Sequence, residues 1–254
     1  LAIRTFDEEI RLDLAPYRYR MVRAIDFYRF MRETLASRPG VQLLQGRIRD
    51  ISAPSTSAGP DRPGENAGTS EHEAGFAEVV VNDVAYRSSW VFDSRYPANA
   101  YRRLRGRYHY LIQHFLGWEI ETEDDVFEPE IPTMFDFRTP QNGTMRFFYI
   151  LPYSKRRGLV EYTVFSDHLL PIDVYRRALK DFLTQQLGLP HYRITQEESD
   201  LIPMTDQPYP RRAGPRVLNI GTRGGRVKPS SGYAFRRIQS DAAAITRSMV
   251  THGH

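Results

Sequence analysis

The chain has 254 residues, of which 41% are hydrophobic and 26% charged, so it is long enough to bury a core and has an ordinary globular composition. It has no cysteine, which excludes disulfides, thiolate nucleophiles and Cys-ligated zinc and is typical of a reducing compartment. The net charge is +4, and nearly all of the basic residues are arginines. No nucleic-acid-binding motif accompanies these arginines, which argues against a nucleic-acid partner. Two interpretations of these arginines stay open: a solvated surface, and attraction to anionic membrane headgroups.

No stretch approaches the roughly 18 consecutive apolar residues that a membrane-spanning helix needs, and no basic-then-apolar leader opens the chain. The first predicted element is an amphipathic helix with Asp26 as its N-cap and apolar residues at helical spacing up to Leu35. The run Arg38-Pro39-Gly40 ends this helix, and the alternating stretch 41–51 predicts a strand.

Residues 52–75 are rich in Pro, Gly, Ser and charge and contain no large apolar residue. Such a segment cannot bury enough surface to order itself, so it is predicted to be a disordered hairpin tip. Strands resume after it, with a turn at Asn82-Asp83, and are predicted over 76–81, 84–88 and 90–92.

The middle of the chain is predicted to form long, aromatic-rich strands, and Asn142-Gly143 is a hairpin signal between two of them. A helix follows from Ile172 to about Leu187 and is closed by Gly188. The last elements are a strand over 216–220, a glycine-rich turn, and an amphipathic helix that starts at Tyr233 and runs to about Val250. The aromatic strands are predicted over 110–121, 134–138, 145–154 and 158–166.

Three segments carry a resemblance when they are taken in order. The first is WVFDSR at 90–95, and the second is RFFYILPYSKRRGLVEYTVFS at 146–166, with Leu159, Glu161 and Thr163 in an L-x-E-x-T pattern. The third is LIPM at 201–204, followed by LNIGTRGGRVKPSSGYAF at 218–235. Together they resemble the lycopene cyclases, and the resemblance covers nearly the whole chain apart from the insert.

The resemblance implies an α/β FAD-binding (Rossmann-like, glutathione-reductase type) fold with an inserted antiparallel sheet domain for the substrate. Residues 1–107 and 201–254 would form a partial FAD-binding domain, and 108–200 the substrate domain. No G-x-G-x-x-G follows any strand, although the family begins with one to hold the ADP moiety. The chain is therefore expected to be a fragment that lacks this N-terminal motif and the family's C-terminal tail.

The implied reaction is an acid-catalysed isomerisation that closes the ionone ring at the acyclic end of lycopene or another linear carotenoid, without net redox. Glu161 is the implied general acid, because a carboxyl facing inward would be desolvated and kept protonated near neutral pH. The alternative for Glu161 is an outward-facing glutamate on a half-buried strand. Many family members carry a second acid directly after the first, whereas this chain has Tyr162.

The aromatic residues on these strands are either core or a polyene tunnel whose ring faces stabilise a carbocation; they are Phe147, Phe148, Tyr149, Tyr153 and Phe165. The implied cofactors are reduced FAD and NAD(P)H as its reductant, and the implied location is cytoplasmic, peripherally associated with the membrane surface. Histidine spacing predicts no metal site. The candidate cofactor-binding residues are Gly221, Gly224, Gly225, Pro229 and Gly232, with Asp93 and Arg95 as further candidates.

Two other functions fit part of the sequence. A redox flavoenzyme of related fold, such as a prenyl reductase or a hydroxylase, would share the glycine-rich segment but would not need the L-x-E-x-T strand. A non-enzymatic carotenoid-binding module would need neither the acid nor the flavin.

Overall fold

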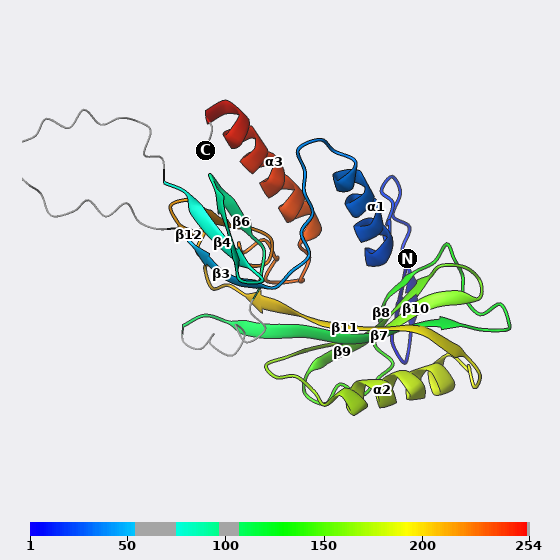
Figure 1. Cartoon of the computed structure of the whole chain (residues 1–254). Helices are drawn as coiled ribbons and strands as arrows, with labels where there is room; N and C mark the ends of the chain where they lie inside the picture. Colours follow the sequence, from blue (N-terminus) through cyan, green and yellow to red (C-terminus); the bar gives the residue numbers. More distant parts are fainter. Residues whose placement is uncertain (54–74, 97–106, 253–254) are drawn as a thin grey trace, which may run out of the picture. The chain divides into compact units, whose positions relative to one another are not determined.

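The computed structural model describes residues 1–53, 75–96 and 107–252. Almost all of the insert predicted at 52–75 lies outside these ranges, so its disorder stays a prediction. The chain forms two compact units (Figure 1). The first contains Leu1–Met21, Tyr101–Gln207 and Pro229–Gly232, and the second contains Val22–Ala100, Pro208–Lys228 and Tyr233–His254.

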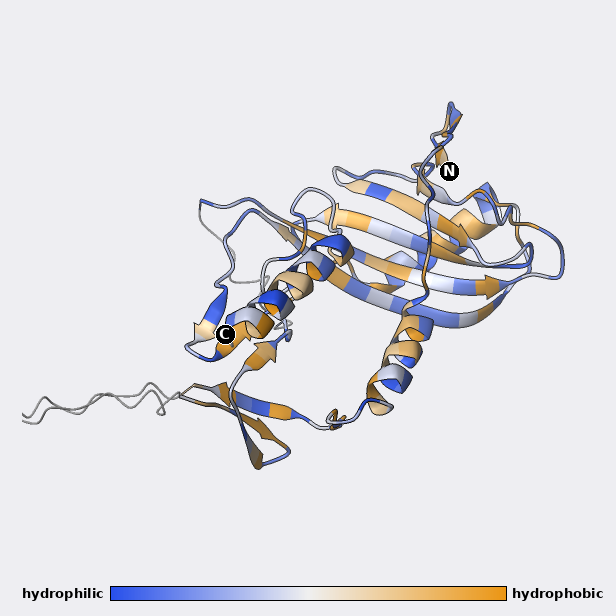
Figure 2. Ribbon diagram, turned by 90° about the horizontal axis from the view of Figure 1, so that it is seen from above, coloured by the Kyte–Doolittle hydropathy of each residue, from blue (hydrophilic) through white to orange (hydrophobic). Residues whose placement is uncertain are grey.

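The first unit is built on a seven-stranded sheet with the order β11-β7-β10-β9-β8-β1-β2. Neighbouring strands pair antiparallel, except that β1 joins β8 in parallel. Figure 2 shows that hydrophobic and hydrophilic segments are mixed along the long strands, as expected where each face of a sheet has its own environment. The strands are β1 (Ala2–Arg4), β2 (Glu9–Arg11), β7 (Tyr110–Glu121), β8 (Thr133–Asp136), β9 (Met145–Pro152), β10 (Arg157–Ser166) and β11 (Arg193–Thr205).

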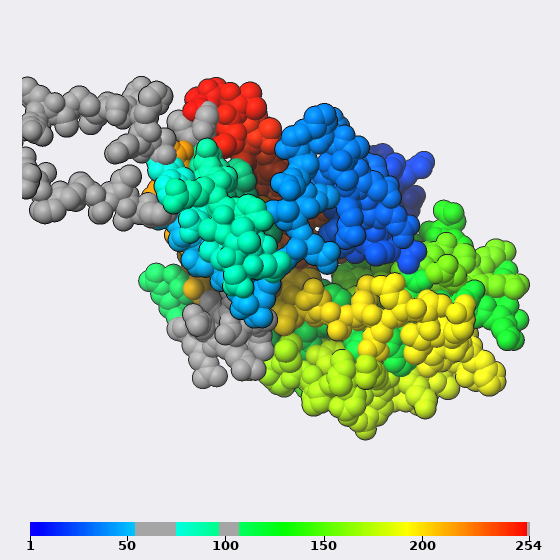
Figure 3. Space-filling model, in the orientation of Figure 1, coloured from blue at the N-terminus to red at the C-terminus, as the bar shows by residue number. Residues whose placement is uncertain are grey.

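The four predicted aromatic strands are confirmed as β7 to β10, and Asn142 and Gly143 both have the positive φ that their hairpin turn needs. The edge strand β11 was not predicted, because its sequence is polar and lacks alternation. Its atoms, yellow in Figure 3, lie at the surface and most of its side chains are exposed. Such polar edges protect a sheet against pairing with other chains.

One face of the sheet carries the hydrophobic core of this unit, and α2 (Ile172–Asp181) covers it (Figure 1). The helix continues into a π-helical turn, Phe182–Gln186, and ends before Gly188, whose φ is +66°. Phe182 stacks on Phe148 of β9 with ring centroids 3.7 Å apart. Tyr162 of β10 packs on the same face and is 2% exposed.

Residues 1–21 belong to this sheet unit, whereas the sequence assigned them to the nucleotide-binding part. The reason is backbone pairing: Ile3 of β1 lies opposite Phe135 of β8. Three-residue strands of this kind have too little sequence to show a periodicity.

The second unit contains two three-stranded sheets, ordered β3-β4-β5 and β12-β13-β6. Positive φ values at Asn82 and Asp83 confirm the predicted turn between β4 and β5. In the second sheet β13 and β6 run parallel. The elements are α1 (Ala24–Ala36), β3 (Ile48–Ser52), β4 (Ala77–Val81), β5 (Val84–Ser88), β6 (Val91–Asp93), β12 (Arg212–Gly214), β13 (Val217–Asn219) and α3 (Phe235–His252).

Three predicted boundaries in this unit are wrong. The first helix begins two residues before Asp26, and Arg23 occupies the N-cap position without a side-chain cap. Asp26 therefore lies in the first turn, where its negative charge interacts favourably with the helix dipole. The strand predicted over 41–51 forms only from Ile48, because only this part pairs with β4. The last helix begins at Phe235 rather than Tyr233. No helix among the described residues is both long and apolar enough to cross a bilayer.

A buried network of hydrogen bonds joins β7 and the end of β10 to the first turn of α2. His114 of β7 is 2% exposed, and its ring nitrogens lie 2.8 Å from Ser166 Oγ and 2.5 Å from the Tyr175 hydroxyl. Burial lowers the pKa of His114 from 6.5 to about 4. The neutral imidazole is therefore part of the folded structure at neutral pH.

We expect this network to make the first unit less stable in acid. Between pH 6.5 and 4 the unfolded chain binds a proton at His114 that the folded chain does not, so the free energy of unfolding falls as the pH drops through this window. At about 1.4 kcal/mol per pKa unit, the loss is about 3 kcal/mol. Equilibrium unfolding at several pH values measures it. His114→Gln should flatten the pH dependence of the free energy of unfolding, and the control His191→Gln, at an exposed site, should not. An unchanged slope in His114→Gln would contradict the assignment of this pH dependence to His114.

Candidate active site

Glu161 lies at the centre of β10 on the sheet face opposite α2. Side chains alternate along a strand, so Glu161 shares its face with Thr163, while Tyr162 points into the α2 core. Glu161 is half-buried, between Gly117 of β7 and Tyr149 of β9 in the strand register. The Glu161 side chain thus projects from the sheet face that does not carry the α2 core, and it is partly buried there.

The surroundings of this carboxyl favour its neutral form. Burial raises the pKa of Glu161 to about 7, and the nearby negative charge of Glu198 adds to the rise. The Thr163 hydroxyl donates a hydrogen bond of 2.9 Å to Glu161 Oε1, which opposes the rise but fixes the orientation of the carboxyl. A substantial fraction of Glu161 is therefore protonated at neutral pH and has a proton to give.

Aromatic rings line the same face beside Glu161. Phe147 is fully buried and makes edge-to-face contacts with Tyr149 and Phe135, at centroid distances of 5.0 and 5.1 Å. Phe137 and Phe165 extend the cluster through further contacts with Phe147. The predicted aromatic set thus divides: Phe148 packs in the α2 core, whereas Phe147, Tyr149 and Phe165 lie on the face of the acid.

Two residues of this site, Glu198 and Gly117, were not predicted from the sequence. Glu198 of β11 and Glu161 of β10 both lie opposite Gly117, on either side of β7. Glu198 is 37 positions further along the chain, in a strand that the sequence did not predict. The only local signal was the glycine inside the otherwise aromatic and aliphatic strand 110–121, since glycine in a strand marks a close approach.

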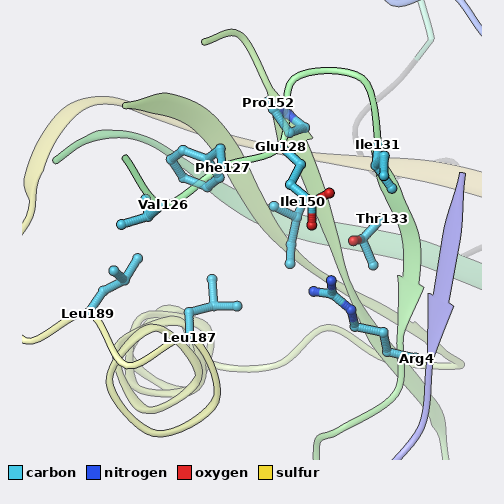
Figure 4. A pocket seen from close by; sticks show the side chains of 10 residues that line it. All are labelled: Arg4, Val126, Phe127, Glu128, Ile131, Thr133, Ile150, Pro152, Leu187 and Leu189. Carbon is cyan, nitrogen blue, oxygen red and sulfur yellow. The ribbon is translucent and has the colours of Figure 1, made fainter. Parts of the chain in front are cut away.

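A separate cavity of about 80 Å³ lies on the α2 side of the sheet (Figure 4). Most of the residues that line it are apolar in type, and Arg4 and Glu128 supply the charged side chains. Arg4 is already paired with Glu9, and Glu128 with Arg11. The cavity does not include Glu161, so it is not part of the candidate site.

The predicted cofactor-side residues begin where β6 and β13 end, in the second unit. Asp93 closes β6, is 3% exposed, and binds the Arg95 guanidinium at 2.9 Å and that of Arg223 at 3.1 Å. Burial opposes the ionisation of Asp93, but the hydrogen bonds from Arg95 and the charge of Arg223 outweigh it and lower the pKa. The carboxyl ends of parallel strands are where α/β sheets bind their ligands.

The glycines after β13 have different surroundings. A Cβ at Gly224 would lie 2.5 Å from the Asn219 carbonyl oxygen, and one at Gly225 3.2 Å from Tyr209, so the chain's own packing explains both. Gly221 has φ +59°, and a Cβ there would meet nothing closer than Ser94 Cβ at 4.0 Å. This open space at a strand end fits the close approach of a flavin nucleotide.

Pro229 and Gly232 belong to the first unit rather than the second. A Cβ at Gly232 would lie 2.3 Å from Oε1 of Gln113, which is 7% exposed and has no hydrogen-bond partner for that oxygen among the described residues. The loop therefore lies directly against β7. Asp93, Arg95, Gly221, Gly224 and Gly225 are together in one unit, and Pro229, Gly232 and Glu161 in the other.

Solved structures with similar folds include the flavin-dependent brominase Bmp2, at 13% identity and a TM-score of 0.52 over 91% of this chain and 57% of that one. The VirX1 apo structure matches at 11% identity and a TM-score of 0.51, over 89% of this chain and 40% of that one. A geranylgeranyl bacteriochlorophyll reductase-like protein from Thermoplasma acidophilum matches at 15% identity and 0.49, over 69% and 45%. The chain spans about half the length of the solved structures that it matches.

These likenesses concern the fold, and the likeness to the flavin-dependent brominase confirms the predicted FAD-binding α/β fold. No match was found among curated proteins. A family model described as lycopene cyclase protein matches residues 3–254, which is nearly the whole chain. The resemblance carried by the L-x-E-x-T strand and the glycine-rich segment is thereby confirmed: this chain belongs to the lycopene cyclase family.

Proposed function

We propose that this chain carries the general acid and the substrate face of a flavin-dependent lycopene cyclase, which closes a six-membered ring at the acyclic end of a linear carotenoid. The observation that supports the proposal is the environment of Glu161: a carboxyl with a pKa raised to about 7, held by Thr163 beside a cluster of aromatic rings. Ordinary surface glutamates do not hold a proton at neutral pH.

In the proposed reaction the Glu161 carboxyl gives its proton to the terminal double bond of the polyene. The resulting carbocation is attacked by a neighbouring double bond, which forms the new ring C–C bond and moves the positive charge onto the ring. Loss of a proton from a ring carbon restores a double bond, so the product is an isomer of the substrate. The residues of this chain supply the first proton and an environment that excludes water from the cation.

The aromatic face suits both the substrate and the cation. Phe147, Tyr149 and Phe135 present ring surfaces that a polyene can contact, and the face of an aromatic ring attracts a cation by about 0.5 to 2 kcal/mol. The aromatic side chains are also poorer nucleophiles than water. The carbocation therefore survives long enough for the carotenoid ring to close.

FAD is the proposed cofactor, in its reduced form, with NAD(P)H as the reductant. The open space at Gly221 and the polar strand ends at Asp93 and Asn219 are the features of this chain that fit the flavin nucleotide. Reduced flavin, when bound, would supply an electron-rich ring that stabilises positive charge or shares in the proton transfers.

Glu161→Gln should abolish cyclisation, because an amide keeps the shape but has no acidic proton. The measurement is pigment analysis with lycopene and the full-length enzyme, with flavin content and melting temperature as controls for folding. In the wild type, activity should fall as the pH rises through about 7, since the acid must be protonated. The matched control is Glu121→Gln, an exposed ion-pair residue of β7. Cyclisation by Glu161→Gln would remove Glu161 from the mechanism, and oxidised or reduced products instead of isomers would indicate the redox alternative.

Gly221→Asn should weaken FAD binding by the full-length protein at least tenfold. Asparagine tolerates the left-handed backbone that Gly221 has, so the fold is retained while the side chain enters the open space. Flavin titration followed by fluorescence measures the affinity. Gly143→Asn is the matched control, because Gly143 also has positive φ and open surroundings but lies in a hairpin turn of the other unit. Equal FAD affinity in both variants would remove Gly221 from the cofactor site.

We also propose that α1 contributes to peripheral binding at an anionic membrane surface, where an apolar carotenoid would be found. The helix has no buried residue, and the exposed side chains of Ile25, Tyr28 and Leu35 share one side at helical spacing, with Arg29 and Arg32 near them. Aromatic side chains next to arginines are typical of interfacial helices.

The double substitution Ile25→Ser with Tyr28→Ser should reduce sedimentation with anionic phospholipid vesicles several-fold, and high salt should reduce wild-type binding. Tyr86→Ser, which removes an exposed aromatic from β5, is the control. Undiminished vesicle binding by the double variant would exclude α1 as the contact.

A further inference from the structure

The strand pairing aligns two glutamates that are distant in sequence. Across the centre of the sheet, the register runs from Glu198 of β11 to Gly117 of β7, then to Glu161 of β10 and Tyr149 of β9. Residues directly opposite one another in neighbouring strands project on the same face. Glu198 and Glu161 therefore lie on one face, with one position between them, and that position is a glycine.

Gly117 keeps the space between the two glutamates open. A Cβ at this position would lie 3.4 Å from Glu161 Cβ and 3.4 Å from Glu198 Cγ, and 3.0 Å from Leu159 Cδ1. Any larger side chain would stand between the two carboxyls, displacing one of them or screening it from the other. The backbone of Gly117 is ordinary extended strand, so no special φ requires a glycine here; an added Cβ would press on Leu159 and touch both glutamates at ordinary contact distance.

The neighbour of Glu161 in sequence cannot supply this partner. Position 162 points to the opposite face, where Tyr162 is buried in the α2 core and 2% exposed. A second acid at 162 would have the thickness of the sheet between it and Glu161. In this chain the carboxylate that can act on Glu161 comes from another strand.

We propose that Glu198 is the ionised partner of Glu161, a positioning residue that acts together with burial to keep the proton on Glu161 until the substrate takes it. This inference rests on the proposed function of Glu161 as the acid. A carboxylate close to a second carboxyl disfavours ionisation of that carboxyl, because two like charges would then share a poorly solvated site. Glu161 is assigned the proton because it lies between two strands, where burial raises its pKa, whereas Glu198 lies on the edge strand.

The other charged groups on this face are already engaged. Glu119 of β7 forms an ion pair with Arg157 of β10, and its carboxylate also accepts a hydrogen bond from Thr195. Asp200 of β11 accepts a hydrogen bond from the Leu201 backbone N–H. Tyr149 adds a phenol next to Glu161 in the register, and Glu198 is the one charged side chain among the described residues whose charge acts on the pKa of Glu161.

The pair also accounts for the return of the proton. When Glu161 has given its proton to the double bond, two carboxylates face one another across Gly117. Their repulsion raises the basicity of Glu161, so it is the group best suited to take the proton that the ring carbon loses. One proton leaves Glu161 and one returns, no electrons are transferred, and Glu198 stays ionised throughout.

The test is Glu198→Gln, which keeps size and polarity but removes the charge. The pKa of Glu161, followed by carbon NMR of labelled glutamate in the folded protein, should fall by about one unit. The pH at which cyclisation is lost should fall equally, giving about a tenfold loss of rate at pH 8 and little loss at pH 5. Glu198→Asp should restore most of the wild-type pH profile, because the charge returns.

Glu197→Gln is the matched control. Glu197 is adjacent on β11 but projects to the other face, where it accepts hydrogen bonds from Trp118 and Arg176. Its loss costs stability without moving the pH profile. A rate loss in Glu198→Gln that is equal at all pH values, with an unmoved Glu161 pKa, would overturn the inference and leave Glu161 as the acid. Full activity of Glu161→Gln would instead overturn the proposed function.

Discussion

The alternation of side chains across one sheet is the constraint on which the candidate site depends. Along β10 the even positions pack under α2 and form the hydrophobic core, while the odd positions carry Glu161 and Thr163. A shift of one residue in register would exchange the two sets, placing a carboxyl in the core and Tyr162 on the other face. The large apolar cluster under α2 therefore fixes the position of Glu161, because any shift in the register of β10 would expose the apolar side chains of the cluster.

Features within one strand could be predicted from the sequence, whereas contacts between strands could not. Glu161 was identified from a short pattern, because Leu159, Glu161 and Thr163 lie on one strand, and the aromatic strands were predicted from composition alone. Glu198 was not, because its closeness to Glu161 exists only through the pairing of β11 with β7 and of β7 with β10. Strand pairing of this kind is non-local, and the polar sequence of β11 gives no periodicity from which to infer it.

Helix ends and glycines were predictable in part, for local reasons. Gly188 and Asn142-Gly143 were correct because positive φ is a property of a single residue and its neighbours. The start of α1 was wrong because Asp26 suits the first turn of a helix as well as its N-cap. Among the candidate cofactor glycines, Gly221 alone faces open space; Gly224 and Gly225 are explained by contacts with Asn219 and Tyr209 that no sequence pattern encodes.

The position of β11 at the edge of the sheet has a consequence for how acidity can vary within such a fold. Glu161 is held between two neighbouring strands, so replacing it disturbs packing on both sides, whereas β11 is hydrogen-bonded along one side only. Substitutions on an edge strand cost less in packing than those in the centre. With the proposed roles of Glu161 and Glu198, the working pH of the acid would be set from the edge of the sheet, by changing a charge on β11 while the central residues remain the same.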